Sequence, residues 1–183
     1  GAAADHPPQS LTAPLLVGNT IKQEYSLNGP VQLLDPAEGI RFDGTDLRLQ
    51  AKEEQLRSDK PFVARRGTAL ARGDGLVVEG RQQTVEIPVG CWLEQPGESL
   101  RARRCRWNWS TQAIEAEGAV QVERPGNRQS LRGERLVGML GPRGRLELTS
   151  PGGRVVSRFA VPRRQGRAPD PAPRRRAPEP IRL

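Results

Sequence analysis

The stretch AIEAEGAVQV, residues 113–122, alternates apolar or small side chains with polar ones. From Ile114 to Val122 every second residue is apolar or small, and charged side chains such as Glu115 and Glu117 fall between them. Alternation over eight or nine residues is typical of a β-strand with one buried face. The stretch therefore predicts a strand rather than a helix.

The same alternation recurs at a fixed spacing along the chain. Similar stretches begin at Leu56 and Val85, and the starts at Leu56, Val85 and Ile114 are each 29 residues apart. A second pattern, apolar-x-small-x-x-apolar-x-(mostly apolar), fits at starting positions Phe42, Ala71, Leu100 and Leu131, with steps of 29, 29 and 31 residues. Stacked repeats of one supersecondary unit bury a continuous core. We therefore predict an all-β protein, an elongated jelly-roll or slab with a repeat of about 29 residues.

The second pattern also predicts a bend in each repeat. The small residue and the next apolar residue are three positions apart, as in Gly44 and Leu47 or Gly73 and Leu76. An odd spacing would place the two on opposite faces of a regular strand, so we expect one extra residue to be accommodated as a β-bulge.

Together the two patterns identify a set of interior positions. These are Phe42, Leu47, Leu49, Leu56, Phe62, Leu76, Val78, Val85, Ile87, Leu93, Leu100, Trp107, Ile114, Val120, Val122, Leu131 and Leu136. The simplest interpretation of such positions is the core of a repeat protein.

The two cysteines, Cys91 and Cys105, flank the turn residues Pro96 and Gly97. If these form a hairpin turn, the cysteines lie directly opposite each other at a separation that a disulfide can bridge. The sequence leaves open whether they are bonded. Their spacing matches no metal motif, and we expect no metal or other cofactor.

The basic charge is concentrated at one end of the chain. The 183 residues carry a net charge of +8, and residues 162–183 contribute seven arginines against two acidic residues. We expect this Arg/Pro-rich tail to be disordered, residues 1–14 to be a disordered leader or linker, and residues 15–161 to form the β domain. No run of 18 apolar residues occurs, so no transmembrane helix is predicted.

Catalysis finds little support in the sequence. The single histidine, His6, lies in the predicted leader, so it cannot form a Ser/His or Cys/His pair within the domain. Asp43 and Asp46 are expected in a turn, where aspartates usually make local hydrogen bonds. We therefore expect a protein that is not an enzyme.

The phrases at residues 56–62, 113–122 and 131–136 resemble the repeat of the OstA/LptA/LptC group, periplasmic proteins of lipopolysaccharide transport. Within it the chain is most similar to LptC, on the Ser58-Asp59-x-Pro61 phrase and the closing residues 152–157. The resemblance covers roughly residues 16–160. It implies a bent β jelly-roll, open along one side, in which the interior positions shelter acyl chains.

The resemblance also implies partners and a location. These are lipopolysaccharide or a related lipid, an inner-membrane ABC transporter, and an LptA-like bridge protein joined through edge strands. Residues 21–33 would face the transporter and residues 153–159 the bridge, in the periplasm beside the inner membrane.

Two alternatives stay open. The chain could be an LptA-like bridge subunit, or an unrelated repeat scaffold that binds an anionic polymer such as nucleic acid through its basic tail. Trp92 and Trp109 fall outside the interior positions, near several arginines, where they could stack on bases or simply cover the outer face of a sheet. We expect no specific nucleic acid.

Overall fold

The structure is a computed structural model that describes residues 10–140 and 144–159. The strands are β1 (Ser10–Thr12), β2 (Leu15–Asn19), β3 (Glu24–Asp35), β4 (Ile40–Gln50), β5 (Gln55–Arg66), β6 (Ala69–Glu79), β7 (Thr84–Ile87), β8 (Val89–Gln95), β9 (Glu98–Ala102), β10 (Arg104–Asn108), β11 (Ala113–Arg124), β12 (Gln129–Met139), β13 (Leu146–Thr149) and β14 (Val156–Phe159). Two single-turn 3-10 helices, η1 (Ala51–Glu53) and η2 (Pro125–Asn127), lie in turns. No helix in the described ranges is long and apolar enough to cross a membrane.

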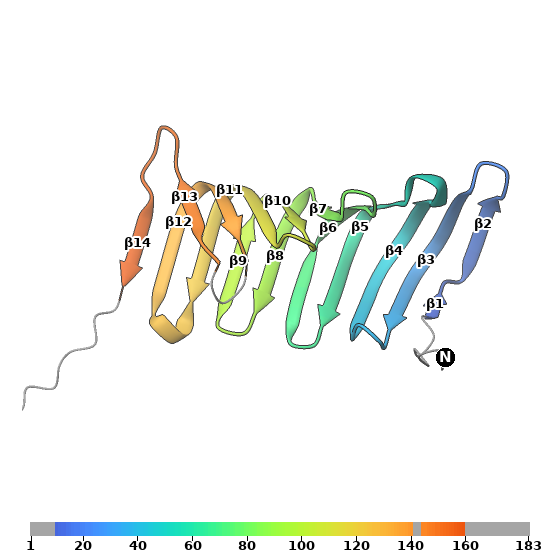
Figure 1. Ribbon diagram of the computed structural model, residues 1–183, viewed down its shortest axis with the longest axis horizontal. Coiled ribbons are helices and arrows are strands. Elements are labelled where there is room, and N and C mark those ends of the chain that lie inside the picture. Colours follow the sequence, from blue (N-terminus) through green and yellow to red (C-terminus); the bar gives the residue numbers. More distant parts are fainter. Residues whose placement is uncertain (1–9, 141–143, 160–183) are drawn as a thin grey trace, which may run out of the picture.

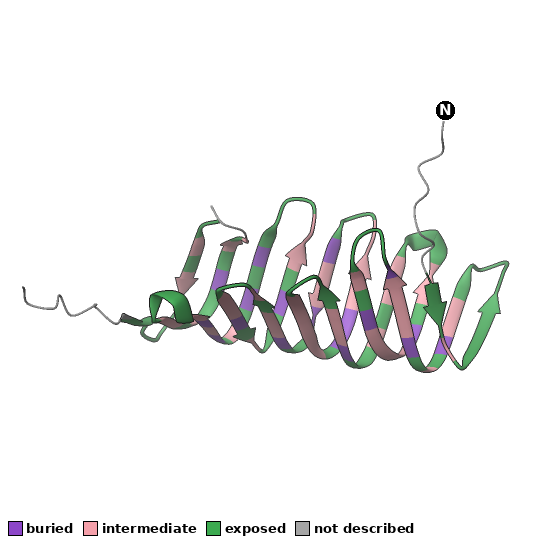
Figure 2. Ribbon diagram, turned by 90° about the horizontal axis from the view of Figure 1, so that it is seen from below, coloured by how far each residue is buried: buried purple, intermediate pink, exposed green. Residues whose placement is uncertain are grey.

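The strands form one antiparallel sheet that is folded along its length into two facing walls (Figures 1 and 2). Wall A contains β2, β7, β10, β13 and the halves of β3, β4, β5, β6, β11 and β12 that pair with them. Wall B contains β1, β8, β9, β14 and the other halves of the same long strands. The predicted all-β architecture with its 29-residue repeat is confirmed.

Bulges at the middle of the long strands connect the walls. The strand register shifts between Leu27 and Pro30, between Ser58 and Pro61, and between Glu117 and Val120. Gly118 has a φ of +78°, a conformation that glycine adopts without steric cost, and its carbonyl accepts a hydrogen bond from the Arg103 amide at 2.8 Å. Bulges are therefore present at the bend, but the extra residue lies in β3, β5 and β11 and not, as expected, in the facing segments such as Gly44–Leu47 and Gly73–Leu76. These bulges turn one sheet into two walls.

A repeated hydrogen bond joins successive turns at the free edge of wall A. Gln23, Glu54, Gln83 and Gln112 all have a positive φ, and the carbonyl of each accepts an amide hydrogen bond from the next repeat. The four bonds measure 2.8 to 3.0 Å. They keep the repeats in phase, and sequence patterns of apolar residues gave no sign of them.

Three element boundaries differ from the sequence expectations. The stretch that begins at Val85 is divided between β7 and β8 at Pro88, which has no amide to donate to a ladder. The unit that begins at Leu100 is divided at Arg103 in the same way, at the bend. β1 falls inside the predicted leader and pairs with β3, whereas residues 1–9 and the whole predicted tail, residues 162–183, lie outside the described residues.

The core fills the angle between the walls next to the bend. Its most buried side chains are Ile114, Leu136, Val120 and Val122, each with at most 1% of its surface exposed. Phe42 and Phe62 stack with ring centroids 5.7 Å apart. Burial of this aliphatic and aromatic surface at the bend holds the walls together.

Candidate functional site: an apolar trough

Two apolar rows face each other above the core. On wall A the row passes through directly paired residues on successive strands, namely Leu49, Leu56, Val78, Val85, Trp107 and Ile114. On wall B the row is Leu33, Phe42, Ala64, Ala71, Leu93, Leu100, Val122 and Leu131. We call the space between these rows the trough.

The predicted interior residues divide into two groups by burial, and four residues of the rows, Phe42, Leu100, Ile114 and Val122, fall in the buried group. Ten are buried in the core: Phe42, Leu47, Phe62, Leu76, Ile87, Leu100, Ile114, Val120, Val122 and Leu136. Seven are only half-buried and line the trough: Leu49, Leu56, Val78, Val85, Leu93, Trp107 and Leu131. Leu33, Ala64 and Ala71 also line it but are absent from the predicted set. Alternation predicts which face a residue occupies, but it gives no information on depth.

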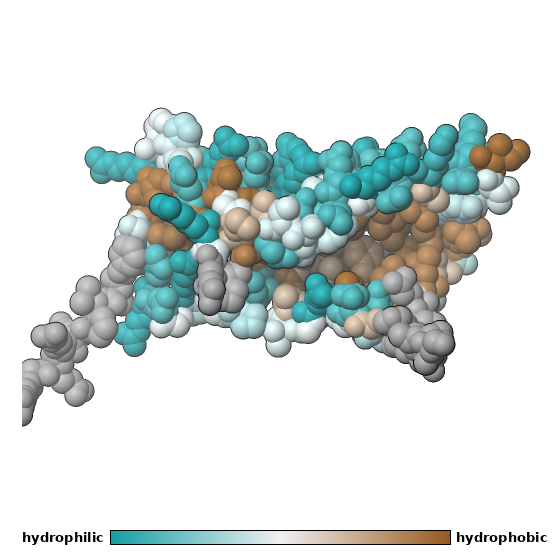
Figure 3. Space-filling model, viewed as in Figure 1, coloured by the Kyte–Doolittle hydropathy of each residue, from teal (hydrophilic) through white to brown (hydrophobic). Residues whose placement is uncertain are grey.

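The trough is more open toward the N-terminal half. Figure 3 shows a hollow with hydrophobic walls over this half, bordered by hydrophilic surface on both sides. Along the rows, Leu49, Leu56 and Val78 are half-buried, whereas Leu100 and Ile114 further along are 4% and 0% exposed. The trough therefore narrows from the N-terminal half toward the C-terminal half.

A disulfide joins Cys91 and Cys105 across the two walls, with their Cα atoms 5.9 Å apart. Both cysteines are buried, at 2% and 3% exposure. The expectation that the two lie opposite each other in one hairpin is wrong, because Cys91 pairs with Ala102 across the turn. Cys105 lies on β10, beyond the bend at Arg103, and pairs with Ile87 of wall A. The bond therefore connects wall B to wall A rather than two neighbouring strands.

Both ends of the molecule present strand edges. At the N-terminal end the outermost strands are β1 and β2, so the expectation that residues 21–33 form this end is wrong, since β3 lies one strand further in. Leu15, Leu16 and Val17 on this edge are 54 to 60% exposed. At the other end the edge strands are β13 on wall A and β14 on wall B.

Trp92 lies on the outer face of wall B, where its ring is covered by the protein's own arginines. The guanidinium carbon of Arg72 lies 3.3 Å from the ring centroid and that of Arg101 lies 3.8 Å from it. These arginines come from the strands on either side of Trp92. The ring is therefore engaged within the sheet and does not form a free platform for bases.

The aspartates considered as catalytic candidates make local contacts. Asp43 accepts a hydrogen bond from Arg41 at 2.8 Å, and this bond, with a second from Gln32, holds the pKa of Asp43 below its usual value. Asp46 accepts the amide hydrogen bond of Gly29 at 2.7 Å, at the bulge. Among the described residues there is no group of three or more histidine, cysteine or acidic side chains that could hold a metal.

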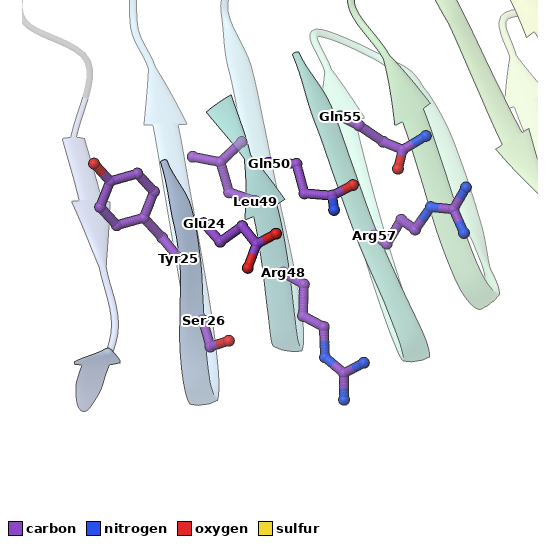
Figure 4. Close-up of a pocket in the computed structure, with 8 residues that line it drawn as sticks. All are labelled: Glu24, Tyr25, Ser26, Arg48, Leu49, Gln50, Gln55 and Arg57. Carbon is purple, nitrogen blue, oxygen red and sulfur yellow. The ribbon is translucent and has the colours of Figure 1, made fainter. Parts of the chain in front are cut away.

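One depression in the surface is lined mostly by polar residues (Figure 4). It measures about 280 Å³ and lies over β3, β4 and β5 of wall A. Arg48 and Arg57, which are directly paired across β4 and β5, line it together with Glu24 and several neutral polar side chains. Leu49 is the one aliphatic side chain in its lining and belongs to the wall A row, so the trough remains the candidate site for an acyl chain.

The long folded sheet with an apolar trough defines an LptA-like β jelly-roll. Comparison with solved structures supports this assignment of the fold: the chain is similar to LptH, the LptA-homologous periplasmic component of the lipopolysaccharide transport device from Pseudomonas aeruginosa. The TM-score is 0.54 at 15% sequence identity, with 77% of this chain and 93% of that chain covered. No protein-family model and no curated protein matches the chain.

Proposed function

We propose that this chain is a periplasmic component of lipopolysaccharide transport that shelters acyl chains in the trough. The observation that carries the proposal is the pair of apolar rows, which run without interruption along the molecule and are partly exposed at residues such as Leu49, Leu56 and Val78. Removing an acyl chain of about a dozen CH₂ groups from water contributes on the order of 10 kcal/mol before the costs of binding. In this proposal the chain performs no chemistry, and the sugars and phosphates of the lipid remain outside.

Photo-crosslinking from single positions tests the proposal. A photoreactive residue at Leu56 or Val78, in the trough, is expected to form adducts with lipopolysaccharide. The neighbours Arg57 and Val77 point to the outer face of the same strands and serve as matched controls. Adducts at Arg57 and Val77 without adducts at Leu56 and Val78 would overturn the proposal.

We further propose that the chain stands at the inner-membrane end of the transport path, as LptC does, and contacts an LptA-like bridge protein through an edge strand. The support is the resemblance around residues 58–61 and the edges at β2 and β14, since unpaired edge strands can add a strand from a partner. Co-purification with the ABC transporter from detergent-solubilised inner membranes is the expected result. Recovery with bridge and outer-membrane components alone would favour a bridge subunit instead.

A further inference from the structure

The outer faces of the two walls differ in charge. On its strands, the outer face of wall B carries Arg41, Arg65, Arg72, Arg101, Arg132 and Arg158 against Asp43, Asp74, Glu94 and Glu123. The outer face of wall A carries Arg48, Arg57, Arg104, Arg106 and Arg135 against Glu24, Glu79, Glu86, Glu115, Glu117 and Glu147. Wall B is therefore basic, whereas the charges on wall A nearly balance.

Most of the arginines on the outer face of wall B have no carboxylate partner. Arg41 forms an ion pair with Asp43, but the ion pairs of the described residues include none of Arg65, Arg72, Arg101, Arg132 or Arg158. Glu123 interacts electrostatically with Arg132 and Arg101, and its carboxylate accepts hydrogen bonds from Gln121 and Ser130. On wall A, by contrast, Arg104 and Arg135 are paired with glutamates.

Three of these arginines lie in one straight row across the strands. Arg72, Trp92, Arg101, Gln121 and Arg132 are successive partners on β6, β8, β9, β11 and β12. The contact with Trp92 holds the guanidinium groups of Arg72 and Arg101 in place. A guanidinium stacked on an aromatic ring keeps the N–H groups at its edge available for oxyanions, so these two are pre-organised to bind phosphate.

A shallow depression extends this row toward the C-terminal edge of wall B. It measures about 150 Å³ and is lined by Ser130, Arg132, Val156 and Arg158 of β12 and β14. The hydroxyl of Ser130 already donates to Glu123, but the two guanidinium groups around this depression suit a phosphate group, because arginine binds phosphate through paired N–H donors.

We propose that the outer face of wall B docks on a bilayer of anionic phospholipid, with Arg72, Arg101, Arg132 and Arg158 contacting lipid phosphates. A row of cations on the flat face of a sheet matches an extended anionic surface. The sequence that follows β14, the edge strand of this wall, adds seven further arginines against two acidic residues. Nucleic acid is disfavoured because the ring of Trp92 is already covered. This docking is independent of whether the trough holds acyl chains.

Vesicle binding by two matched variants of the full chain tests the proposal. One variant carries Arg101→Gln, Arg132→Gln and Arg158→Gln on wall B. The other carries Arg48→Gln, Arg57→Gln and Arg106→Gln on wall A, so both lose the same charge and keep the tail. For vesicles of phosphatidylcholine with phosphatidylglycerol, the wall B variant is expected to lose affinity on the order of 100-fold, since each arginine near such a surface contributes about a factor of five. The wall A variant should lose far less, and vesicles of phosphatidylcholine alone should bind weakly throughout.

Equal losses in the two variants would overturn the proposal, since binding would then follow net charge alone. The proposal would also be overturned if the wall B variant lost affinity for a single-stranded oligonucleotide but kept its affinity for vesicles. The lysine variant Arg101→Lys, Arg132→Lys, Arg158→Lys keeps the charge and should retain most of the affinity. In the unaltered background, a photoreactive residue at Gln121, but not at Glu115 on wall A, should crosslink phosphatidylglycerol. The reverse pattern contradicts docking through wall B, whatever the stability of the glutamine variants.

Discussion

Reduction of the Cys91–Cys105 disulfide is expected to destabilise the fold measurably, because this bond is a covalent link between the two walls. The two cysteines are 14 positions apart in the sequence. Closing a loop of about 15 residues lowers the entropy of the unfolded chain by an amount that corresponds to about 3 kcal/mol of stability. For a domain of this size each kcal/mol changes the melting temperature by about 2 to 4 °C, so reduction should lower it by about 6 to 12 °C.

Thermal unfolding followed by circular dichroism, with and without a reducing agent, measures this shift. The variant Cys91→Ala, Cys105→Ala provides the control, because its melting temperature should be low in both conditions and should not respond to reduction. Hydrogen exchange should show the largest loss of protection in β8 and β10, the strands that the bond connects. If reduction leaves the melting temperature of the unaltered protein unchanged, the bond makes no net contribution and the reasoning from loop closure is wrong.

Two further predictions concern the core and the outer face. Ile114→Ala removes most of a side chain that is 0% exposed, and it should lower the free energy of unfolding in urea by about 2 to 5 kcal/mol. Ile21→Ala, at a residue that is 94% exposed, should change it by less than about 0.5 kcal/mol. Similar losses in the two variants would contradict the placement of the core. Arg41→Gln should raise the pKa of Asp43 toward its ordinary value, as measured by carboxyl carbon NMR. Because the folded pKa is depressed, the stabilisation is present above the ordinary pKa of about 4 and is lost as the pH falls through the folded value. The difference in free energy of unfolding between the unaltered protein and the variant should therefore shrink as the pH falls. If the variant leaves the titration of Asp43 unchanged, the role given to Arg41 is wrong.

The repeat was predictable from the sequence because each strand has one buried face. The alternation from Ile114 to Val122 and its copies at 29-residue steps gave the strands, their phase and the side chains that point inward. The odd spacing between small and apolar residues such as Gly73 and Leu76 predicted a bulge in each repeat, but the extra residue lies in the partner strand. These features are local, so one strand is enough to reveal them.

The depth of each side chain was not predictable, because it depends on how the walls meet. Leu56 and Leu76 belong to equivalent patterns, yet Leu56 is half-buried in the trough and Leu76 is buried beside the bend. The cross-wall position of the disulfide depends on the same geometry, since Arg103 lies at a bend rather than within a straight hairpin. The turn hydrogen bonds at Gln23 and its equivalents involve backbone groups, which side-chain patterns do not report.

The arginine row on wall B was only partly visible in the sequence. Arg72, Arg101 and Arg132 directly follow Ala71, Leu100 and Leu131, so they occupy the same position of the repeat. The register adds that Trp92 and Gln121 stand between them in one cross-strand row. The sequence placed Trp92 near arginines but did not show that Arg72 covers its ring. The local charge on a sheet surface depends on residues that are neighbours across strands, whereas the sequence shows only which residues are neighbours along a strand.

The claim that acyl chains occupy the trough is tested most directly by NMR with methyl-labelled leucine and valine and bound lipopolysaccharide. Nuclear Overhauser effects from lipid methylene protons are expected at the methyl groups of Leu49, Leu56 and Val78. None are expected at Val77 on β6 or Val137 on β12, whose side chains point to the outer face of wall A. Contacts at Val77 and Val137 without contacts at the trough residues would contradict the account.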